Sequence, residues 1–264
     1  MLKINLKFDK NIMAREMISK SRMPVDFANY LWEKYNSSYT LLKQNINAND
    51  IDFNIIKEIE NQGFFEKNVA LAKKNLKRIN NNWKNKQDYI NEFLSKIFKN
   101  TLDITTTGYI VSPNIRSGHN IGNNEFVWGH DQGVQDCNYD LVYLVHESLH
   151  SIFDLDNLSH VIIENICDIE LAKSLNNSKI GYKGHKFLYD YHSKILPYWN
   201  LYLNRSQKEI IEEQKSQNAK YNANDFEKYR KKLANMDIYK FIKFAKHTIG
   251  KFDIEEQFKV DTKV

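Results

Sequence analysis

The apolar positions of the chain repeat first with the period of a strand and then, over a long stretch, with the period of a helix. Leu2, Ile4, Leu6 and Phe8 alternate with polar residues, which predicts a short strand near the start of the sequence. From residue 24 to about residue 99 the apolar residues recur at helical spacing in separate stripes. We therefore expect several helices before the middle of the chain.

The second half of the chain adds two strand signals and more helices. Residues 101–112 are rich in β-branched side chains and end at Pro113, and residues 125–129 predict another short strand. Together with the flanking helices, these strands predict an α+β, predominantly helical fold with a small sheet. The helices are predicted over about 139–153, 159–175, 206–217, 225–234 and 238–249, with Gly250 as the last stop and with one more stretch from 183 that Pro197 interrupts.

Length and composition fit one compact body. The chain has 264 residues, 42% of them hydrophobic, which is enough to bury a sizeable core. Within that body we expect an N-terminal strand and helical region over 1–100, a central region over 101–205 and C-terminal helices over 206–264.

Charge and cysteine content narrow the function classes. The net charge is +5, but Lys and Arg are interspersed with Asp and Glu, which predicts a mixed-charge surface and no nucleic-acid partner. No segment approaches the ~20 apolar residues that span a bilayer, and the start of the chain shows no secretory signal pattern. Two cysteines, Cys137 and Cys167, make no disulfide framework. We expect a cytoplasmic protein without a membrane partner; export by another route and the oligomeric state stay open.

One motif points to metal chemistry. His146, Glu147 and His150 form a His-Glu-x-x-His motif. On a helix, positions i and i+4 share a face, so both imidazoles can bind one ion at about 2.0–2.1 Å. The side chain of Glu147 can reach a water on the open side of that ion. Apolar flanks predict a buried helix, where these polar groups require either a metal or a hydrogen-bond network.

A third ligand is expected on the following helix. A catalytic zinc site takes three protein ligands and keeps one position open. Glu164 and Asp168 stand four residues apart and are expected to share a helical face. Glu164 can complete the ligand set, and Asp168 can accept the free ring N–H of a ligating histidine. Asp156 and His160 are the alternatives for the third ligand.

A His-Glu-x-x-His motif followed on the next helix by Glu-x-x-x-Asp resembles the zinc site of the thermolysin-like metallopeptidases, the gluzincin group of the zincins. The resemblance covers about residues 125–175 and implies a zincin-like catalytic core within 101–205. It implies Zn²⁺ as the cofactor, Glu147 as the general base and Asp168 as a support for one histidine. The zinc ligands that it implies are His146, His150 and Glu164. Thirteen residues separate His150 from Glu164, fewer than in typical members of the group.

Two further features bear on a peptide substrate. Residues 123–129 stand where zincins carry an edge strand beside the cleft, and such a strand can pair with an extended peptide. An ordinary strand with Trp128 in the core is the equal alternative. A group that stabilises the oxyanion should also lie opposite the base. The candidates in residues 181–192 are His185 and Tyr191, with Tyr189 and His192 as alternatives that spacing does not exclude.

These features predict a zinc metallopeptidase that hydrolyses a peptide or protein substrate. Zinc lowers the pKa of a bound water, and Glu147 takes the proton of that water and passes it to the leaving amine. Two alternatives remain: a zinc-bound regulatory protein that senses or cleaves a single partner, and an inactive scaffold in which the metal only joins helices.

Overall fold

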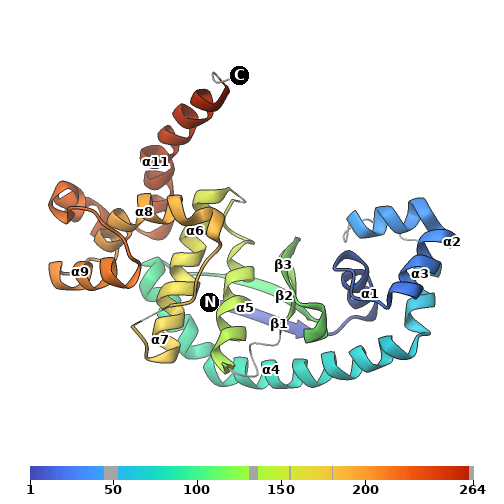
Figure 1. Ribbon diagram of the computed structural model, residues 1–264. Coiled ribbons are helices and arrows are strands. Elements are labelled where there is room, and N and C mark those ends of the chain that lie inside the picture. Colours follow the sequence, from blue (N-terminus) through green and yellow to red (C-terminus); the bar gives the residue numbers. More distant parts are fainter. Residues whose placement is uncertain (45–52, 131–135, 155, 180, 262–264) are drawn as a thin grey trace. The chain divides into compact units, whose positions relative to one another are not determined.

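The computed structural model describes residues 1–44, 53–130, 136–154, 156–179 and 181–261 (Figure 1). The chain divides into two compact units, each described here by itself. The sheet unit comprises residues 2–87 and 104–152, and the helical unit comprises Met1 with residues 88–103 and 153–264. The boundaries near residues 100 and 205 stay predictions.

The sheet unit contains a mixed four-stranded sheet in the order β1-β2-β4-β3. β1 and β2 are parallel, β2 and β4 are parallel, and β3 runs antiparallel to β4. The α+β class with a small sheet is thus confirmed. Because β4 is paired on both sides, the edge position expected for residues 123–129 is wrong, and the equal alternative, an ordinary strand with Trp128 in the core, is confirmed. In the described sheet, β3 is the outer strand next to β4. The strands are β1 (Leu2–Lys7), β2 (Ile104–Ile110), β3 (Ser117–Gly122) and β4 (Glu125–Gly129).

The α-helices of this unit come from the segment between β1 and β2 and from the segment after β4. Buried apolar side chains of α1, α3 and the first part of α4 share one core with Tyr109, Val111 and Val127 of the sheet region. The long α4 helix carries two of the predicted helical stripes and continues past residue 87 into the helical unit. The helical elements are α1 (Lys10–Ser19), α2 (Val25–Gln44), α3 (Phe53–Glu60), α4 (Gly63–Phe98), η1 (Pro113–Ile115) and α5 (Cys137–Leu149).

The helical unit is built around large buried aromatic residues. The rings of Trp199 and Tyr202 pack against Phe241 with centroid distances of 5.6 Å and 4.6 Å. These three side chains are fully buried. Its elements are α6 (Asn157–Glu164), the π-helix η3 (Asn165–Leu171), α7 (Ala172–Asn176), η4 (Lys186–Leu188), α8 (Tyr189–Tyr202), α9 (Gln207–Ser216), η5 (Ala223–Tyr229), α10 (Arg230–Ala234) and α11 (Ile238–Asp261).

Two expected helix breaks in this unit are wrong. Pro197 lies inside α8, where Leu196 and Trp199 are buried in the core and hold the helix across the missing backbone donor. Gly250 lies inside α11, which continues to Asp261. A glycine costs only about 1 kcal/mol in a helix interior, so it does not by itself end a long helix.

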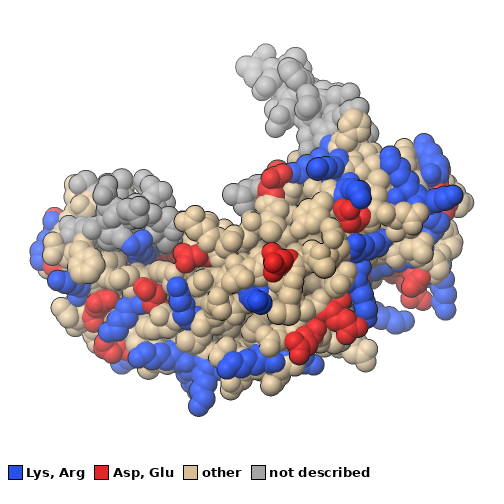
Figure 2. Space-filling view, turned by 180° about the vertical axis from the view of Figure 1, so that it is seen from behind, with Lys and Arg blue, Asp and Glu red and all other residues tan. Residues whose placement is uncertain are grey.

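Surface charge agrees with the mixed pattern of the sequence. Basic and acidic side chains both occur across the face shown in Figure 2. Among the described residues, none of the helices combines the length and the apolar content that crossing a membrane requires.

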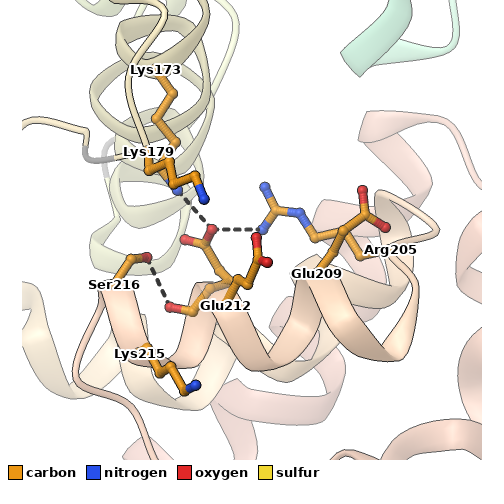
Figure 3. Close-up of a pocket in the computed structure, with 8 residues that line it drawn as sticks. Lys173, Lys179, Arg205, Glu209, Glu212, Lys215 and Ser216 are labelled. Carbon is orange, nitrogen blue, oxygen red and sulfur yellow. Dashed lines mark hydrogen bonds and ion pairs between the residues drawn. The ribbon is translucent and has the colours of Figure 1, made fainter.

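A buried ion cluster ties α9 to the region around η3 within the helical unit (Figure 3). Lys173 Nζ donates to Glu213 Oε2 at 2.7 Å, and Arg205 Nη1 lies 3.3 Å from the same oxygen. Arg205 also binds both carboxylate oxygens of Glu170, at 2.6 Å and 2.7 Å. The Glu213 side chain is only 7% exposed. Glu213 therefore pairs with Lys173 and shares Arg205 with Glu170.

Replacing Glu213 with alanine is expected to lower the free energy of unfolding by about 3 kcal/mol, because it leaves the largely buried Lys173 without its counter-charge and removes one of the two carboxylates around Arg205. Urea denaturation measures the change. Glu212→Ala is the matched control, since Glu212 is exposed in the same pocket and its loss should stay within about 0.5 kcal/mol. Equal stability of the two variants would contradict the stabilising role of Glu213.

Candidate metal centre

The His-Glu-x-x-His motif lies at the end of a buried helix of the sheet unit. α5 begins after Asp136, whose carboxylate accepts the backbone N–H of Asn138 at 2.9 Å. His146 and Glu147 are 2% and 7% exposed, and His150 is half-buried. The helix ends at Leu149 and not near residue 153 as predicted, so His150 is its C-cap residue. Both histidines nevertheless keep helical backbone geometry.

A row of stacked rings orients the two histidines. Trp128 of β4 stacks on Tyr143 with a centroid distance of 5.3 Å, and Tyr143 stacks on His146 at 5.6 Å. The ring centroids of His146 and His150 are 5.1 Å apart. This spacing places the two imidazoles side by side on one face of α5, as the motif predicts.

The start of α5 is fixed by a buried carboxylate. Asp140 accepts the indole N–H of Trp128 at 2.8 Å and forms an ion pair with Arg78 of α4 at 2.6 Å. Burial raises the pKa of Asp140, and the contacts with Trp128 and Arg78 oppose that rise. The Trp128 ring is therefore fixed by its stacking on Tyr143 and by the hydrogen bond from its nitrogen to Asp140. The row of rings from Trp128 to the histidines begins at this fixed position.

The edge strand β3 lies beside this helix. The side-chain amide of Asn120 donates to the backbone carbonyl of Glu147 at 3.3 Å. On the other side of the motif, Ser148 Oγ lies 3.0 Å from the hydroxyl of Thr106 in β2. The end of α5 is therefore hydrogen-bonded to β3 through Glu147 and to β2 through Ser148.

Glu164 is the last residue of α6 in the helical unit, and its side chain is fully buried. Asp156 is the N-cap of α6, and its carboxylate accepts the backbone N–H and the hydroxyl of Ser159 at 2.9 Å and 2.8 Å. Directly after Glu164 the helix widens into the π-helix η3. π-helical turns inside helices occur often at functional sites.

Two histidines bind the Glu164 carboxylate. His185 Nδ1 lies 2.6 Å from Glu164 Oε1, and the backbone N–H of His185 donates to the same oxygen at 2.8 Å. His192 Nε2 donates to Glu164 Oε2. On α6 itself, His160 Nε2 lies 3.9 Å from Glu164 Oε1.

These contacts keep Glu164 ionised. Burial would raise the pKa of its carboxyl group, but the hydrogen bonds from His185 and His192 outweigh burial and hold the pKa well below its usual range. A carboxylate must be deprotonated to bind a metal ion. Glu164 therefore has the charge state of a ligand at neutral pH.

Glycine permits the close approach that brings His185 to Glu164. A Cβ at Gly184 would lie 2.3 Å from Glu164 Oε2, and a Cβ at Gly181 would lie 2.6 Å from the carbonyl oxygen of Asp168. The backbone N–H of Tyr182 donates to that same carbonyl at 2.6 Å. The loop 181–184 thus lies directly against α6 and η3.

A group of residues in the helical unit can hold a metal ion. His160, Glu164 and His185 each offer one ligand atom, and these three atoms lie within 4.8 Å of one another. Two imidazoles and one carboxylate are a donor set that suits zinc. His146 and His150 are a second pair of nitrogen ligands, within the sheet unit.

Three other residues were predicted for the site, namely Asp156, Asp168 and Tyr191, and the structure gives each of them different surroundings. Asp156 acts as the α6 cap and pairs with Lys246 at 2.8 Å, which already explains its position. Asp168 is buried in the π-helix η3, four positions after Glu164. Its contact with a ligating histidine stays a prediction. Tyr191 lies under the ammonium of Lys194, 5.7 Å from the ring centroid to Nζ.

The sequence offered His192 only as an alternative for stabilising the oxyanion, and it predicted neither the contact of His192 with Glu164 nor the role of Gly184. His192 lies 28 positions after Glu164, and no local spacing rule joins residues at that separation. The run Gly-Tyr-Lys-Gly-His at 181–185 was the available signal, since paired glycines often mark a close approach of backbone.

Gly184→Ala is expected to displace the Glu164 carboxylate and to lower the free energy of unfolding by about 1–3 kcal/mol, the usual cost of overpacking. Chemical denaturation and the zinc content of the purified variant measure the effect. Gly63→Ala is the control, because no atom lies within 4 Å of a Cβ there. If both variants match the parent protein in stability and zinc content, the close packing at Gly184 has no such role.

Comparison of the chain with family models, with curated proteins and with solved structures found no match. The interpretation of the site therefore depends on its own residues.

Proposed function

We propose that the chain is a zinc-dependent metallopeptidase that hydrolyses peptide bonds with a zinc-activated water. The observation that carries the proposal is the pair of largely buried imidazoles on α5, with ring centroids 5.1 Å apart and with Glu147 between them in the sequence. Neutral imidazoles one helical turn apart are a common way to bind zinc. His146 and His150 are two of the proposed ligands.

Glu164 is the proposed third ligand. Its support is its charge state, together with its place on the helix that follows the motif after a short connection. Asp156 is a weaker choice, because its carboxylate caps α6 and pairs with Lys246. His160 remains the alternative on the same helix. This proposed ligand set is based on the order of the residues in the sequence and on the chemistry of each side chain.

Each protein group has a defined role in the proposed reaction. When bound, zinc supplies a Lewis acid that acidifies water and polarises the substrate carbonyl. Glu147 accepts the proton of the attacking water, and it then gives that proton to the nitrogen of the leaving amine as the C–N bond breaks. His146, His150 and Glu164 would hold the ion. His185 and Tyr191 stay the predicted candidates for stabilising the oxyanion.

The neighbouring edge strand favours an extended peptide as the substrate. β3 is an outer strand of the described sheet and contacts the backbone of Glu147 through Asn120. An edge strand offers backbone donors and acceptors to an added chain. Peptide pairing with β3 would run beside the general base.

Metal removal tests the proposal. The purified chain is analysed for zinc and incubated with a library of synthetic peptides, whose cleavage is followed by mass spectrometry before chelation, after it and after zinc is restored. We expect stoichiometric zinc and hydrolysis that is lost and regained. Zinc without hydrolysis of any peptide would favour the scaffold alternative, and cleavage of one protein alone would favour the regulatory alternative. Hydrolysis that persists in the metal-free protein would refute the proposal.

A further inference from the structure

A pocket of about 570 Å³ opens in the helical unit next to Glu164. Its walls come from the loop 181–184, the first half of α8 and the end of α9, and they include Tyr182, Tyr189 and Leu196. Pockets of 300–1,000 Å³ hold drug-sized ligands, so this one exceeds the volume of a single side chain. It has room for one residue of a peptide and for the chain on either side of it.

Two wall residues of this pocket contact the Glu164 carboxylate. His192 donates to Glu164 Oε2, and the backbone of Gly184 packs against the same carboxylate. A ligand in the pocket therefore lies one side chain away from the proposed zinc ligand. In a peptidase such a pocket receives a substrate residue close to the bond that is cleaved.

Apart from two tyrosines, the ionisable side chains that line the pocket in the described part of the chain are basic or histidine. Its described lining contains Lys173, Lys183 and His192 but neither aspartate nor glutamate. Lys173 is paired with Glu213, whereas Lys183 is exposed and makes no hydrogen bond or ion pair in the described part of the chain. Ser193, Ser216, Gln217 and Asn218 add polar groups to the rim. Glu164 does not line the pocket, and its carboxylate is hydrogen-bonded to His185 and His192.

We propose that this pocket binds the carboxylate of a glutamate or aspartate side chain in the peptide substrate, with Lys183 as the residue that determines this preference. The proposal rests on the peptidase function and adds the substrate class to it. An apolar floor of Ile169 and Leu196 suits the methylene part of such a side chain, while the ammonium and the rim donors suit its carboxylate. The room around one side chain favours an internal residue over a chain end.

Binding tests the proposal without relying on turnover. Fluorescent peptides with both ends blocked carry either glutamate or glutamine at the centre, and a third peptide has no acidic side chain but a free C-terminal carboxylate. Fluorescence anisotropy gives their dissociation constants on the full-length Glu147→Gln variant. The glutamate peptide is expected to bind about tenfold more tightly than the glutamine peptide, as a charge-assisted hydrogen bond predicts.

Lys183→Glu is expected to abolish or reverse this preference. Lys179→Glu is the matched control and should retain it, because Lys179 is an exposed lysine that does not line this pocket. Equal affinity for the two blocked peptides, or a preference that Lys183→Glu leaves unchanged, would overturn the proposal. Tightest binding of the peptide with the free C-terminus would overturn the assignment to an internal side chain.

The two proposals fail separately. If the glutamate preference is found but the zinc-loaded parent protein cleaves no peptide, the pocket assignment stands and the peptidase function does not. If cleavage is found but its sites show no enrichment of acidic residues and binding shows no preference, the peptidase function stands and the pocket assignment is wrong.

Discussion

Glu147→Gln is expected to lower peptide hydrolysis by about 10²–10⁴-fold, the range for loss of a general acid–base group. Glutamine has the shape of glutamate but cannot take the proton of the attacking water. Zinc content is expected to stay at the level of the parent protein, because the proposed ligands are all unchanged. Single-turnover cleavage of a library peptide, measured with metal analysis of the same sample, gives both quantities.

The control for this variant is Glu66→Gln, the same chemical change at a surface position of the sheet unit. The Glu66 side chain is 63% exposed, and Lys10 Nζ lies 3.9 Å from its carboxylate. Its hydrolysis rate should equal that of the parent protein. Glu147→Gln with full activity would show that Glu147 is not the base, whatever metal is bound.

Loss of zinc is the second large expected effect. His146→Ala and Glu164→Ala should each lose stoichiometric zinc, because each removes one of three proposed protein ligands. His185→Ala should keep zinc, with an affinity reduced by about 10–100-fold, since His185 positions a ligand through its hydrogen bond. Elemental analysis after dialysis against a weak chelator separates the two outcomes.

An exposed histidine, His247, provides the control, and His247→Ala should bind zinc as the parent protein does. The opposite pattern is also informative. Zinc that survives His146→Ala but is lost in both His160→Ala and His185→Ala would place the ion on the His160, Glu164 and His185 group. The proposed base would then have no water to activate.

The sequence predicted the strands that have alternating apolar and polar residues or many β-branched residues. It did not predict β3, which is a strand only because of its hydrogen bonds to β4. The alternation from Leu2 to Phe8 and the β-branched run after residue 101 match β1 and β2 closely. β3, with the sequence Ser-Gly-His-Asn-Ile-Gly, has low β-propensity, and its pattern predicts no strand. It is extended because it pairs with β4, and this pairing also moves β4 away from the edge of the sheet.

The spacing of apolar residues predicted where helices occur, but it predicted their lengths less well. Stripes around residues 69–79 and 83–97 predict helices, and both belong to α4 because neither glycine nor proline interrupts it after Gly63. The π-helix after Glu164 had no recognisable signal in the sequence. A single wide turn depends on the packing around it, here the loop 181–184 against η3.

The sequence by itself determined the imidazole pair and the glutamate between its members, because positions four apart on a helix share a face whatever surrounds the helix. It also determined a predominantly helical α+β chain with a small sheet. Only the tertiary structure decided which groups bind the Glu164 carboxylate. His185 and His192 lie 21 and 28 positions away from it. Contacts at that separation depend on how whole elements pack, and the hydrogen bonds that result decide the charge state of a buried carboxylate.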